Sequence, residues 1–223
     1  MPSTLHVGIV AFRSSCRRPE CNPRLEQTRR RESIQNQNLD QASEWMKMTG
    51  RLGFRIITDL PRPAPQLVER FRGVASSNAA DAMGRFHFMD PGLKSRSGVP
   101  MCGIAVTVSC RPGDNLMVHK ALEVAELGDV VVITTNGNTT SAVFGELMCH
   151  SAVAARLGGI VVDGAIRDVS AITNLAFPAY SRSVNPGGCD KDGPGEINGR
   201  TSRTSSRSAR AEVAATTRRT TRR

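Results

Sequence analysis

The stretch GIVVDGAIRD, residues 159–168, gives the clearest indication of the fold class. It opens with Ile160-Val161-Val162, a β-branched apolar run that is typical of a strand buried on both faces of a sheet. It closes with Arg167 and Asp168, two charged residues placed where such a strand would end. Ligands of open α/β sheets bind beyond the carboxyl ends of the strands, so this stretch predicts both a core strand and a candidate site.

Two segments before this stretch predict neighbouring strands of the same sheet. Residues 103–110 alternate and are rich in β-branched side chains, and the turn that follows ends in Asp114, which would cap a helix. That helix ends at Gly128, and residues 130–133 follow as a buried apolar strand. Strand, helix and strand form a βαβ unit, so the fold class is predicted to be α/β with a partly parallel central sheet.

Further helices are expected on both sides of this unit. Thr139 or Thr140 would cap a helix that runs to about residue 157, where Gly158-Gly159 ends it. Two shorter helices are expected nearer the N-terminus, the first over residues 67–74 and the second from a cap at Ser76 or Ser77 to about Gly84.

Positive charge is concentrated at the two ends of the chain. The formal net charge is +10, but residues 199–223 hold eight arginines against one acid and so carry +7 of it. Residues 1–44 add +2, which leaves residues 45–198, with 15 basic and 14 acidic side chains, at +1. The central part therefore has no electrostatic reason to bind nucleic acid.

The chain is expected to divide into three parts. Residues 1–45 are polar without periodicity, so we predict a disordered extension, with Met46 or Met48 as an alternative start. Residues 46–198 are predicted to form one catalytic domain. Residues 199–223 are an Arg/Ser/Thr-rich tail whose abrupt start is typical of a shifted reading frame; the alternative is a basic tail that binds RNA.

The sequence predicts neither a membrane partner nor disulfides. No run approaches the ~18 consecutive apolar residues that a membrane helix needs, and no signal-peptide pattern is found. The six cysteines form no C-x-x-C pair and no zinc-like spacing with histidine, so we interpret them as free thiols. We therefore expect a cytoplasmic protein.

Two loops at the ends of predicted strands carry side chains that suit a binding site. The loop 134–140 leads into a predicted helix, whose first backbone N–H groups could hold a carboxylate or a phosphate. The loop 163–168 places a guanidinium beside a carboxylate, an arrangement able to hold an oxyanion and a metal together. The alternative for this second loop is a simple ion pair or a helix cap.

Five other polar residues are left out of the catalytic set. Asp163 would at most orient the arginine four residues later. Asp114 and Asn115 are interpreted as helix-capping residues. His119 and His150 fall within predicted helices, where a core or surface role is more common than a ligand role.

A set of short motifs surrounds the Arg-Asp pair. An acid, Glu146, is followed after twenty residues by Arg167-Asp168, with GDVVV at 128–132, GELM at 145–148 and GEIN at 195–198. In these motifs the chain resembles the RraA-like family, which includes 4-hydroxy-4-methyl-2-oxoglutarate/4-carboxy-4-hydroxy-2-oxoadipate aldolases and homologues called regulator of ribonuclease activity. The resemblance covers roughly residues 60–198 and implies an RraA-like swivelling β/β/α domain and a homotrimer.

The resemblance also implies a role for each site residue. Asp168 would bind a divalent cation, Mg²⁺ or Mn²⁺, and Glu146 would support the water shell of that cation. Arg167 would contact the keto oxygen of a keto-acid substrate. The substrate carboxylate would be held by the backbone amides of Gly145, Glu146, Leu147 and Met148.

The implied reaction is a metal-dependent (class II) aldolase cleavage of 4-hydroxy-4-methyl-2-oxoglutarate, which releases pyruvate through its enolate. Oxaloacetate decarboxylation is expected as a second activity, because it leaves the same enolate. A Schiff-base route would need a buried lysine, and no lysine follows a predicted buried strand. The alternative function is a non-catalytic regulator that binds a ribonuclease or RNA complex, although Glu146 favours the enzyme because a binding module does not need an acid at that spacing.

The resemblance ends at Asn198. Family members usually continue through further strands and a C-terminal helix, which residues 199–223 do not resemble. Without those strands, sheet edge and core would be exposed, so this form of the chain is expected to be at risk of inactivity.

Overall fold

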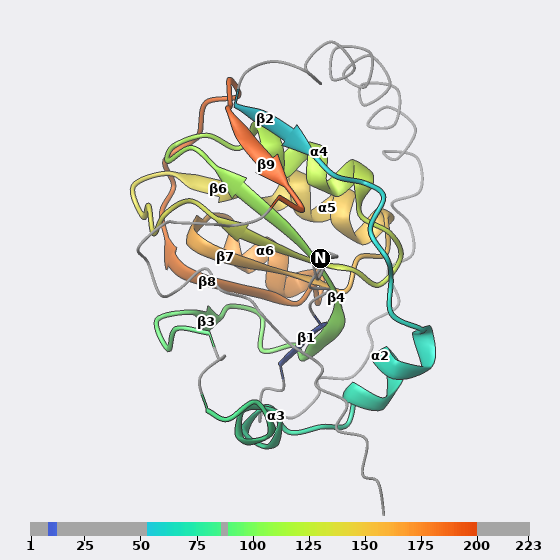
Figure 1. Cartoon of the computed structure of the whole chain (residues 1–223). Coiled ribbons are helices and arrows are strands. Elements are labelled where there is room, and N and C mark those ends of the chain that lie inside the picture. The colour runs from blue at the N-terminus through green and yellow to red at the C-terminus, as the bar shows by residue number, and fades with distance from the viewer. Residues whose placement is uncertain (1–8, 13–52, 86–88, 200–223) are drawn as a thin grey trace, which may run out of the picture.

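The computed structural model describes residues 9–12, 53–85 and 89–199 (Figure 1). The predicted tail lies outside these residues apart from Gly199, and so does the predicted extension apart from residues 9–12, which form a strand that the sequence did not predict. The strands are β1 Ile9–Phe12, β2 Phe54–Ile56, β3 Lys94–Ser95, β4 Met101–Cys110, β5 Val130–Thr134, β6 Ala142–Phe144, β7 Gly159–Ile166, β8 Ala179–Val184 and β9 Gly195–Ile197. The helices are α2 Pro65–Phe71, α3 Ser76–Ala82, α4 Leu116–Val124, α5 Glu146–Ala154 and α6 Val169–Asn174.

A mixed sheet forms the centre of the molecule, with strand order β2-β9-β4-β5-β7-β8-β3. The four central strands β4, β5, β7 and β8 are parallel to one another, whereas β9 and β3 pair antiparallel to β4 and β8. All eight residues of β7 are buried, as expected for a strand with a neighbour on each side and cover on both faces. The predicted α/β class and the partly parallel sheet are confirmed.

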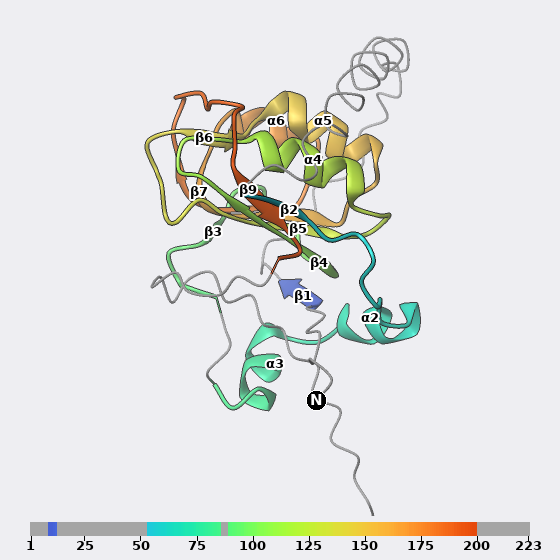
Figure 2. The same cartoon turned by 45° about the horizontal axis from the view of Figure 1, so that its top comes forward.

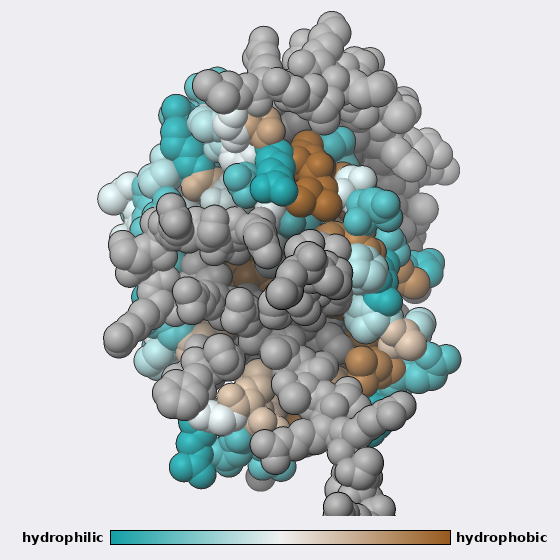
Figure 3. Space-filling model, viewed as in Figure 1, coloured by the Kyte–Doolittle hydropathy of each residue, from teal (hydrophilic) through white to brown (hydrophobic). Residues whose placement is uncertain are grey.

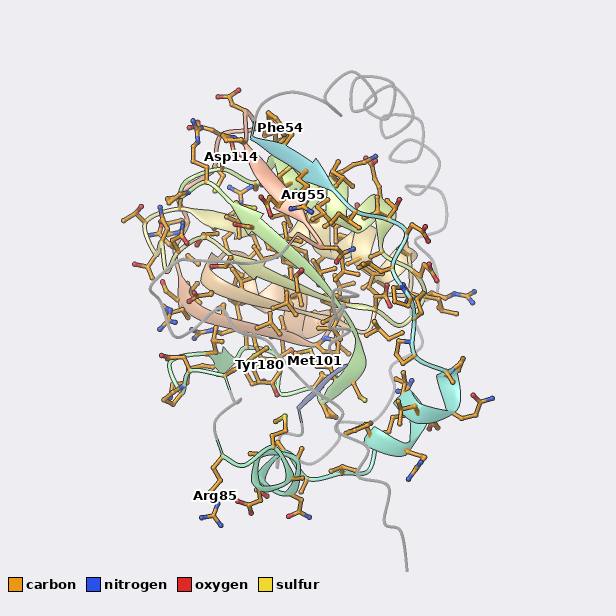
Figure 4. The ribbon with its side chains drawn as sticks, in the orientation of Figure 1. Phe54, Arg55, Arg85, Met101, Asp114 and Tyr180 are labelled. Carbon is orange, nitrogen blue, oxygen red and sulfur yellow. The ribbon has the colours of Figure 1, made fainter. Side chains whose placement is uncertain are left out.

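Helices and short segments cover the two faces of the sheet unequally. Figure 2 shows α4, α5 and α6 together over one face and α2 and α3 on the opposite side. The larger apolar core lies under α4, α5 and α6 and includes Phe144, whose ring stacks against Phe177. A smaller cluster on the other face includes Met101 and Tyr180, which lie near each other in Figure 4. The amphipathic α4, the largely buried β5 and the fully buried β7 thus build the core that positions the ends of the strands.

The helix predicted to start at Thr139 or Thr140 begins instead at Glu146, so that prediction is wrong. The reason is Ala142–Phe144, a buried apolar triplet that pairs with the end of β7 as the short parallel strand β6. Helix α5 ends at Ala154, close to the predicted stop, with Arg156 in the left-handed conformation after it. The N-terminus of α5 therefore lies at the end of β6 and not at the 134–140 loop.

The predicted caps are partly correct. The carboxylate of Asp114 accepts a hydrogen bond of 2.9 Å from the N–H of Leu116 in the first turn of α4, but Asn115 occupies the cap position and makes no side-chain cap bond. The predicted serines do not cap α3: Ser76 is already the first residue of the helix, and Ala75 occupies the cap position without a side-chain bond. Helix α2 also ends earlier than predicted, at Phe71.

Large apolar side chains are exposed at three positions of the described residues. Leu127, Leu147 and Val184 have 70%, 74% and 50% of their surface accessible. On the face drawn in Figure 3, the hydrophobic residues form separate patches among hydrophilic ones. Leu147 is the one of the three that lies beside the predicted site, at the second residue of α5.

Candidate active site

The end of β7 and the start of α5 bring the predicted site residues together. The N–H of Arg167 donates a hydrogen bond of 2.9 Å to the carbonyl of Phe144, the last residue of β6. The N–H of Glu146 in turn donates to the carboxylate of Asp168 at 3.1 Å. These two bonds join segments that are about twenty residues apart in the sequence and fix the Arg-Asp pair against the beginning of α5.

Arg167 and Asp168 form an open ion pair. The Nε of Arg167 lies 3.5 Å from Oδ2 of Asp168, and 44% and 42% of the two side chains are exposed. Asp168 has a φ of 57° and stands at the cap position of α6, yet its side chain makes no capping bond there. A left-handed backbone is costly for a residue other than glycine and is concentrated at functional sites. The helix-cap alternative is therefore not what the geometry shows, since the carboxylate faces Arg167 and α5 instead.

Gly145 sits directly beneath this pair. A Cβ atom added at position 145 would lie 2.8 Å from Oδ2 of Asp168 and 2.9 and 3.0 Å from Cγ and Nε of Arg167. The backbone of Gly145 is extended, with a φ of −153°, so the glycine is needed for space and not for its torsion angle. The missing side chain lets both charged groups lie against the main chain.

Gly145→Ala is expected to lower kcat/KM for pyruvate release by about tenfold or more. The added methyl group would displace Arg167 and Asp168, and a displacement on the order of 1 Å of a positioning group lowers the rate by at least that factor. The free energy of unfolding should change little, because the two displaced side chains are partly exposed. Steady-state kinetics and thermal unfolding of the variant measure the two effects. Gly73→Ala, at a position with no neighbouring atom within 4 Å, is the matched control. Wild-type turnover by Gly145→Ala would show that the close packing is not needed.

The first turn of α5 offers backbone donors toward the same place. The amide of Glu146 is used by Asp168, and the amide of Cys149 donates to the carbonyl of Gly145 at 2.9 Å. The amides of Leu147 and Met148 lie between them in the first turn, where a helix supplies no carbonyl partner of its own. Together with the positive end of the helix dipole, they can hold a carboxylate.

Glu146 meets the pair through its backbone and not through its side chain. Its carboxylate is half exposed and lies 3.7 Å from Nε2 of His150, one turn later in α5. The side chain is therefore free of the Arg-Asp ion pair and directed along the helix surface. His150 is placed on a helix, as predicted.

A divalent cation fits this set of donors in one particular way. No group of three or more His, Cys, Asp or Glu side chains that could hold a metal occurs among the described residues. Asp168 supplies the carboxylate of the pair, whereas the carboxylate of Glu146 lies near His150. Mg²⁺ is commonly held by one or two carboxylates while it keeps several waters, so a hydrated hard cation fits and a cation that needs a full protein cage does not.

Asp163 contacts Arg182 and not Arg167. Both Nε and Nη2 of Arg182 lie 2.6 Å from Oδ1 of Asp163, and Nη1 of the same guanidinium lies 3.3 Å from Asp90. The other carboxylate oxygen of Asp163 is buried and has no hydrogen-bond partner among the described residues. The suggestion that Asp163 orients Arg167 is therefore not supported, because its carboxylate pairs with Arg182 on strand β8.

The 134–140 loop does not form the anion site that its sequence suggested. Its polar groups bond within the loop and to β7: the side chain of Asn138 accepts from the N–H of Thr140 at 2.8 Å, and the hydroxyl of Thr135 donates to the carbonyl of Asp163 at 2.9 Å. No helix follows it directly, since β6 intervenes. The prediction fails because the helix start was placed too early.

The remaining candidates behave as expected from the sequence. Burial lowers the pKa of His119 to about 4, with nearby Lys191 as a second cause, so this histidine is neutral at physiological pH. The four cysteines of the described residues, Cys102, Cys110, Cys149 and Cys189, are free thiols. None of the helices in the described ranges is both long and apolar enough to span a membrane.

One segment beside Arg167 was missed as part of the site. A Cβ atom at Gly188 would lie 3.8 Å from Nη1 of Arg167, so the loop 185–190 comes close to the guanidinium. The Asn-Pro-Gly-Gly sequence predicts a turn, but a turn signal alone does not reveal which distant side chain the turn will contact.

The fold and this site define the chain as an α/β protein with a candidate site for an anion and a cation at the carboxyl end of its central strand. The chain belongs to the RraA-like family (Aldolase/RraA), whose family model matches residues 76–203. The family expected from the sequence motifs is confirmed.

Curated proteins are similar to part of this chain. The "Putative 4-hydroxy-4-methyl-2-oxoglutarate aldolase" of Halalkalibacterium halodurans is 35% identical over 132 residues, which are 59% of this chain and 63% of the relative. A protein of the same name from Hahella chejuensis is 32% identical over 111 residues, which are 50% of this chain and 65% of the relative. The chain thus spans less than two thirds of the length of either relative.

Solved structures share the fold at low sequence identity. The RNA-processing inhibitor RraA from Thermus thermophilis has a TM-score of 0.52 and 24% identity, covering 56% of this chain and 76% of that one. RraAS2 from Streptomyces coelicolor, described as an unusual member of the RNase ES inhibitor RraA protein family, has a TM-score of 0.53 and 23% identity, covering 61% and 72%. This likeness confirms the RraA-like α/β fold.

Proposed function

We propose that the chain is a divalent-metal-dependent lyase that cleaves a carbon–carbon bond of a 2-oxo acid and releases pyruvate, with 4-hydroxy-4-methyl-2-oxoglutarate as the substrate. The observation that carries the proposal is the position of the Arg167-Asp168 pair, which is packed on Gly145 at the N-terminus of α5. Donors for a carboxylate, a cation for an oxyanion and a carboxylate for a metal all meet at that point. The names of the two curated relatives point to the same reaction.

The residues divide the work of the reaction according to their charges. The amides of Leu147 and Met148, to which the helix itself supplies no carbonyl partner, bind the C1 carboxylate of the substrate at the helix N-terminus. The guanidinium of Arg167 then faces the C2 keto oxygen, which becomes negatively charged as the bond between C3 and C4 breaks. The C4 hydroxyl gives up its proton to a water molecule as C4 becomes a keto carbon, and the electron pair of the C3–C4 bond moves into the pyruvate enolate. Arg167 stabilises this charge.

Asp168 and Glu146 supply the acidic side of the site. Asp168 would hold the divalent cation, Mg²⁺ or Mn²⁺, which when bound adds positive charge near the developing oxyanion. Glu146, half exposed at the first residue of α5, would support the water that protonates C3 of the enolate. Oxaloacetate decarboxylation follows from the same arrangement, because loss of carbon dioxide leaves the same enolate.

Two further features remain predictions. A homotrimer would give the exposed Leu147 beside the site a surface to pack against. A cytoplasmic location is expected from the sequence. The alternative function, a regulator that binds a ribonuclease or RNA complex, has support in the fold alone, through the Thermus structure described as an RNA-processing inhibitor.

The proposal is tested by pyruvate release from 4-hydroxy-4-methyl-2-oxoglutarate and from oxaloacetate, with Mg²⁺ or with EDTA. We expect turnover of both compounds with Mg²⁺ and a loss of about 10²-fold or more with EDTA, because the charge on the metal stabilises the transition state. Readdition of Mg²⁺ or Mn²⁺ should restore the rate. A folded chain that releases no pyruvate in any of these conditions contradicts the lyase and favours the regulator.

A further inference from the structure

Two glycines, Gly145 and Gly188, lie near the side chain of Arg167. They leave different amounts of space for an added side chain. A Cβ atom at Gly145 would lie 2.9 and 3.0 Å from Cγ and Nε of Arg167, which is closer than ordinary contact. A Cβ atom at Gly188 would lie 3.8 Å from Nη1, an ordinary van der Waals distance, with no other neighbour within 4 Å in the described part of the chain. The space between Gly145 and Arg167 therefore has no room for a further group. The space between Gly188 and Arg167, called the open side, has room for one.

The backbone on the open side is held in place by hydrogen bonds to two strands. The N–H of Ala142 donates to the carbonyl of Gly187 at 2.8 Å, and the thiol of Cys189 donates to the carbonyl of Ala142 at 3.2 Å. Burial raises the pKa of Cys189, so this thiol keeps the proton it donates. The N–H of Asn185 donates to the carbonyl of Ile166 at 3.0 Å. A new side chain at the centre of this loop could not be relieved easily by a movement of the loop.

Neither torsion angle nor packing requires a glycine at position 188. Its φ lies outside the left-handed region, so an L-residue can adopt the same backbone. Gly187 differs, because a Cβ there would lie 2.9 Å from the carbonyl oxygen of Thr140 and 3.0 Å from the side-chain oxygen of Asn185. What the glycine at 188 provides is empty space beside the guanidinium of Arg167.

The proposed function gives that space an occupant. The C1 carboxylate binds at the N-terminus of α5, which begins at Gly145, and the C2 keto oxygen faces Arg167. C3 and C4 continue from C2 away from C1, and the inference places them beside Gly188, next to Nη1 of Arg167. In oxaloacetate C4 is a flat carboxylate, whereas in 4-hydroxy-4-methyl-2-oxoglutarate C4 is tetrahedral and carries a hydroxyl, a methyl and a carboxylate group.

We propose that Gly188 is a specificity-determining position, which admits 2-oxo acids whose C4 carries three substituents besides C3. The inference rests on the proposed function and adds the reason why the bulkier substrate is accepted. A methyl group at position 188 would occupy the space that the C4 substituents need, and it would affect the flat C4 of oxaloacetate less. Small differences in a pocket of this kind are worth about 10- to 200-fold in discrimination.

The test compares kcat/KM for the two substrates in the full chain with Mg²⁺, for the wild type, Gly188→Ala and Gly188→Val. The ratio of the 4-hydroxy-4-methyl-2-oxoglutarate value to the oxaloacetate value should fall about tenfold for alanine and further for valine. Gly73→Ala, which also adds one methyl group without a close neighbour, should leave the ratio within about twofold of the wild type, since its site is open. Residual oxaloacetate turnover shows that each variant is folded.

Three results would overturn the inference. One is an unchanged ratio in both variants while oxaloacetate is still decarboxylated. Another is a wild-type chain that decarboxylates oxaloacetate but does not cleave the bulkier compound, which leaves the pyruvate-forming chemistry intact and removes the role of Gly188. The third is a wild-type chain that turns over neither compound, which contradicts the proposed function and the inference together.

Discussion

Replacement of Arg167 by alanine should lower kcat/KM for pyruvate release by about 10²- to 10³-fold, the usual effect of removing one donor from an oxyanion site. The guanidinium is the positive side chain at the N-terminus of α5 and lies 3.5 Å from Asp168. With 44% of its side chain exposed, it contributes little to the core. The free energy of unfolding should therefore change by less than about 1 kcal/mol, as for other surface ion pairs.

The matched control is Arg167→Lys, which keeps the positive charge but loses the planar fork of donors. We expect an activity between those of the wild type and Arg167→Ala, with the larger part of the loss in kcat, because the interaction strengthens as the enolate forms. Steady-state kinetics with oxaloacetate provide the comparison. If Arg167→Ala retained more than about a tenth of the wild-type kcat/KM, Arg167 would not be the oxyanion donor.

Asp114→Ala should destabilise the fold by about 3 kcal/mol, because a fully buried carboxylate would leave several donors without an acceptor. One oxygen accepts from Leu116 at 2.9 Å, and the other accepts from the amides of Asp192 and Gly193 at 2.7 and 2.9 Å. Asp114 thus joins the start of α4 to the segment that leads into β9. Figure 4 shows it at the same end of the molecule as Phe54 of β2.

Denaturant unfolding of the full chain measures this effect, with Asp190→Ala as the control. Asp190 shares the partner Arg111 with Asp114, but 71% of its side chain is exposed, and its two backbone hydrogen bonds survive the substitution. It should cost less than about 0.5 kcal/mol. Asp114→Asn should fall between the two, since it keeps one acceptor oxygen. Equal unfolding midpoints for Asp114→Ala and Asp190→Ala would show that the buried carboxylate does not join the two segments.

The elements that were predictable from sequence are those whose pattern is local. Strands β4, β5 and β7 and helix α4 have apolar runs or alternation with turn residues at their ends, and all four were expected. Strand β6 was read as helix because three apolar residues do not distinguish the two structures. Strands β2 and β9 have three residues each, and Phe54 pairs with Gly195, so their state depends on a partner about 140 residues away.

The candidate site was predictable to the extent that it lies in one motif. The family resemblance, carried by the spacing from Glu146 to Arg167-Asp168, implied which residues meet, and the structure brings them together through the amide of Glu146. Two contacts could not be predicted from the sequence. They are the pairing of Asp163 with Arg182 and the approach of Gly188 to Arg167. Both join residues that are close in the fold for reasons of strand order, which the local sequence does not encode.

We propose above all that the site between α5 and β7 stabilises the enolate of pyruvate. Exchange of the pyruvate methyl protons with deuterium from D₂O, followed by NMR, tests this claim directly when the wild-type chain is compared with Asp168→Ala. We predict exchange by the wild type with Mg²⁺, suppression by EDTA, and no exchange above background for Asp168→Ala. Folded wild-type protein that leaves the methyl protons unexchanged in the presence of Mg²⁺ would contradict the claim.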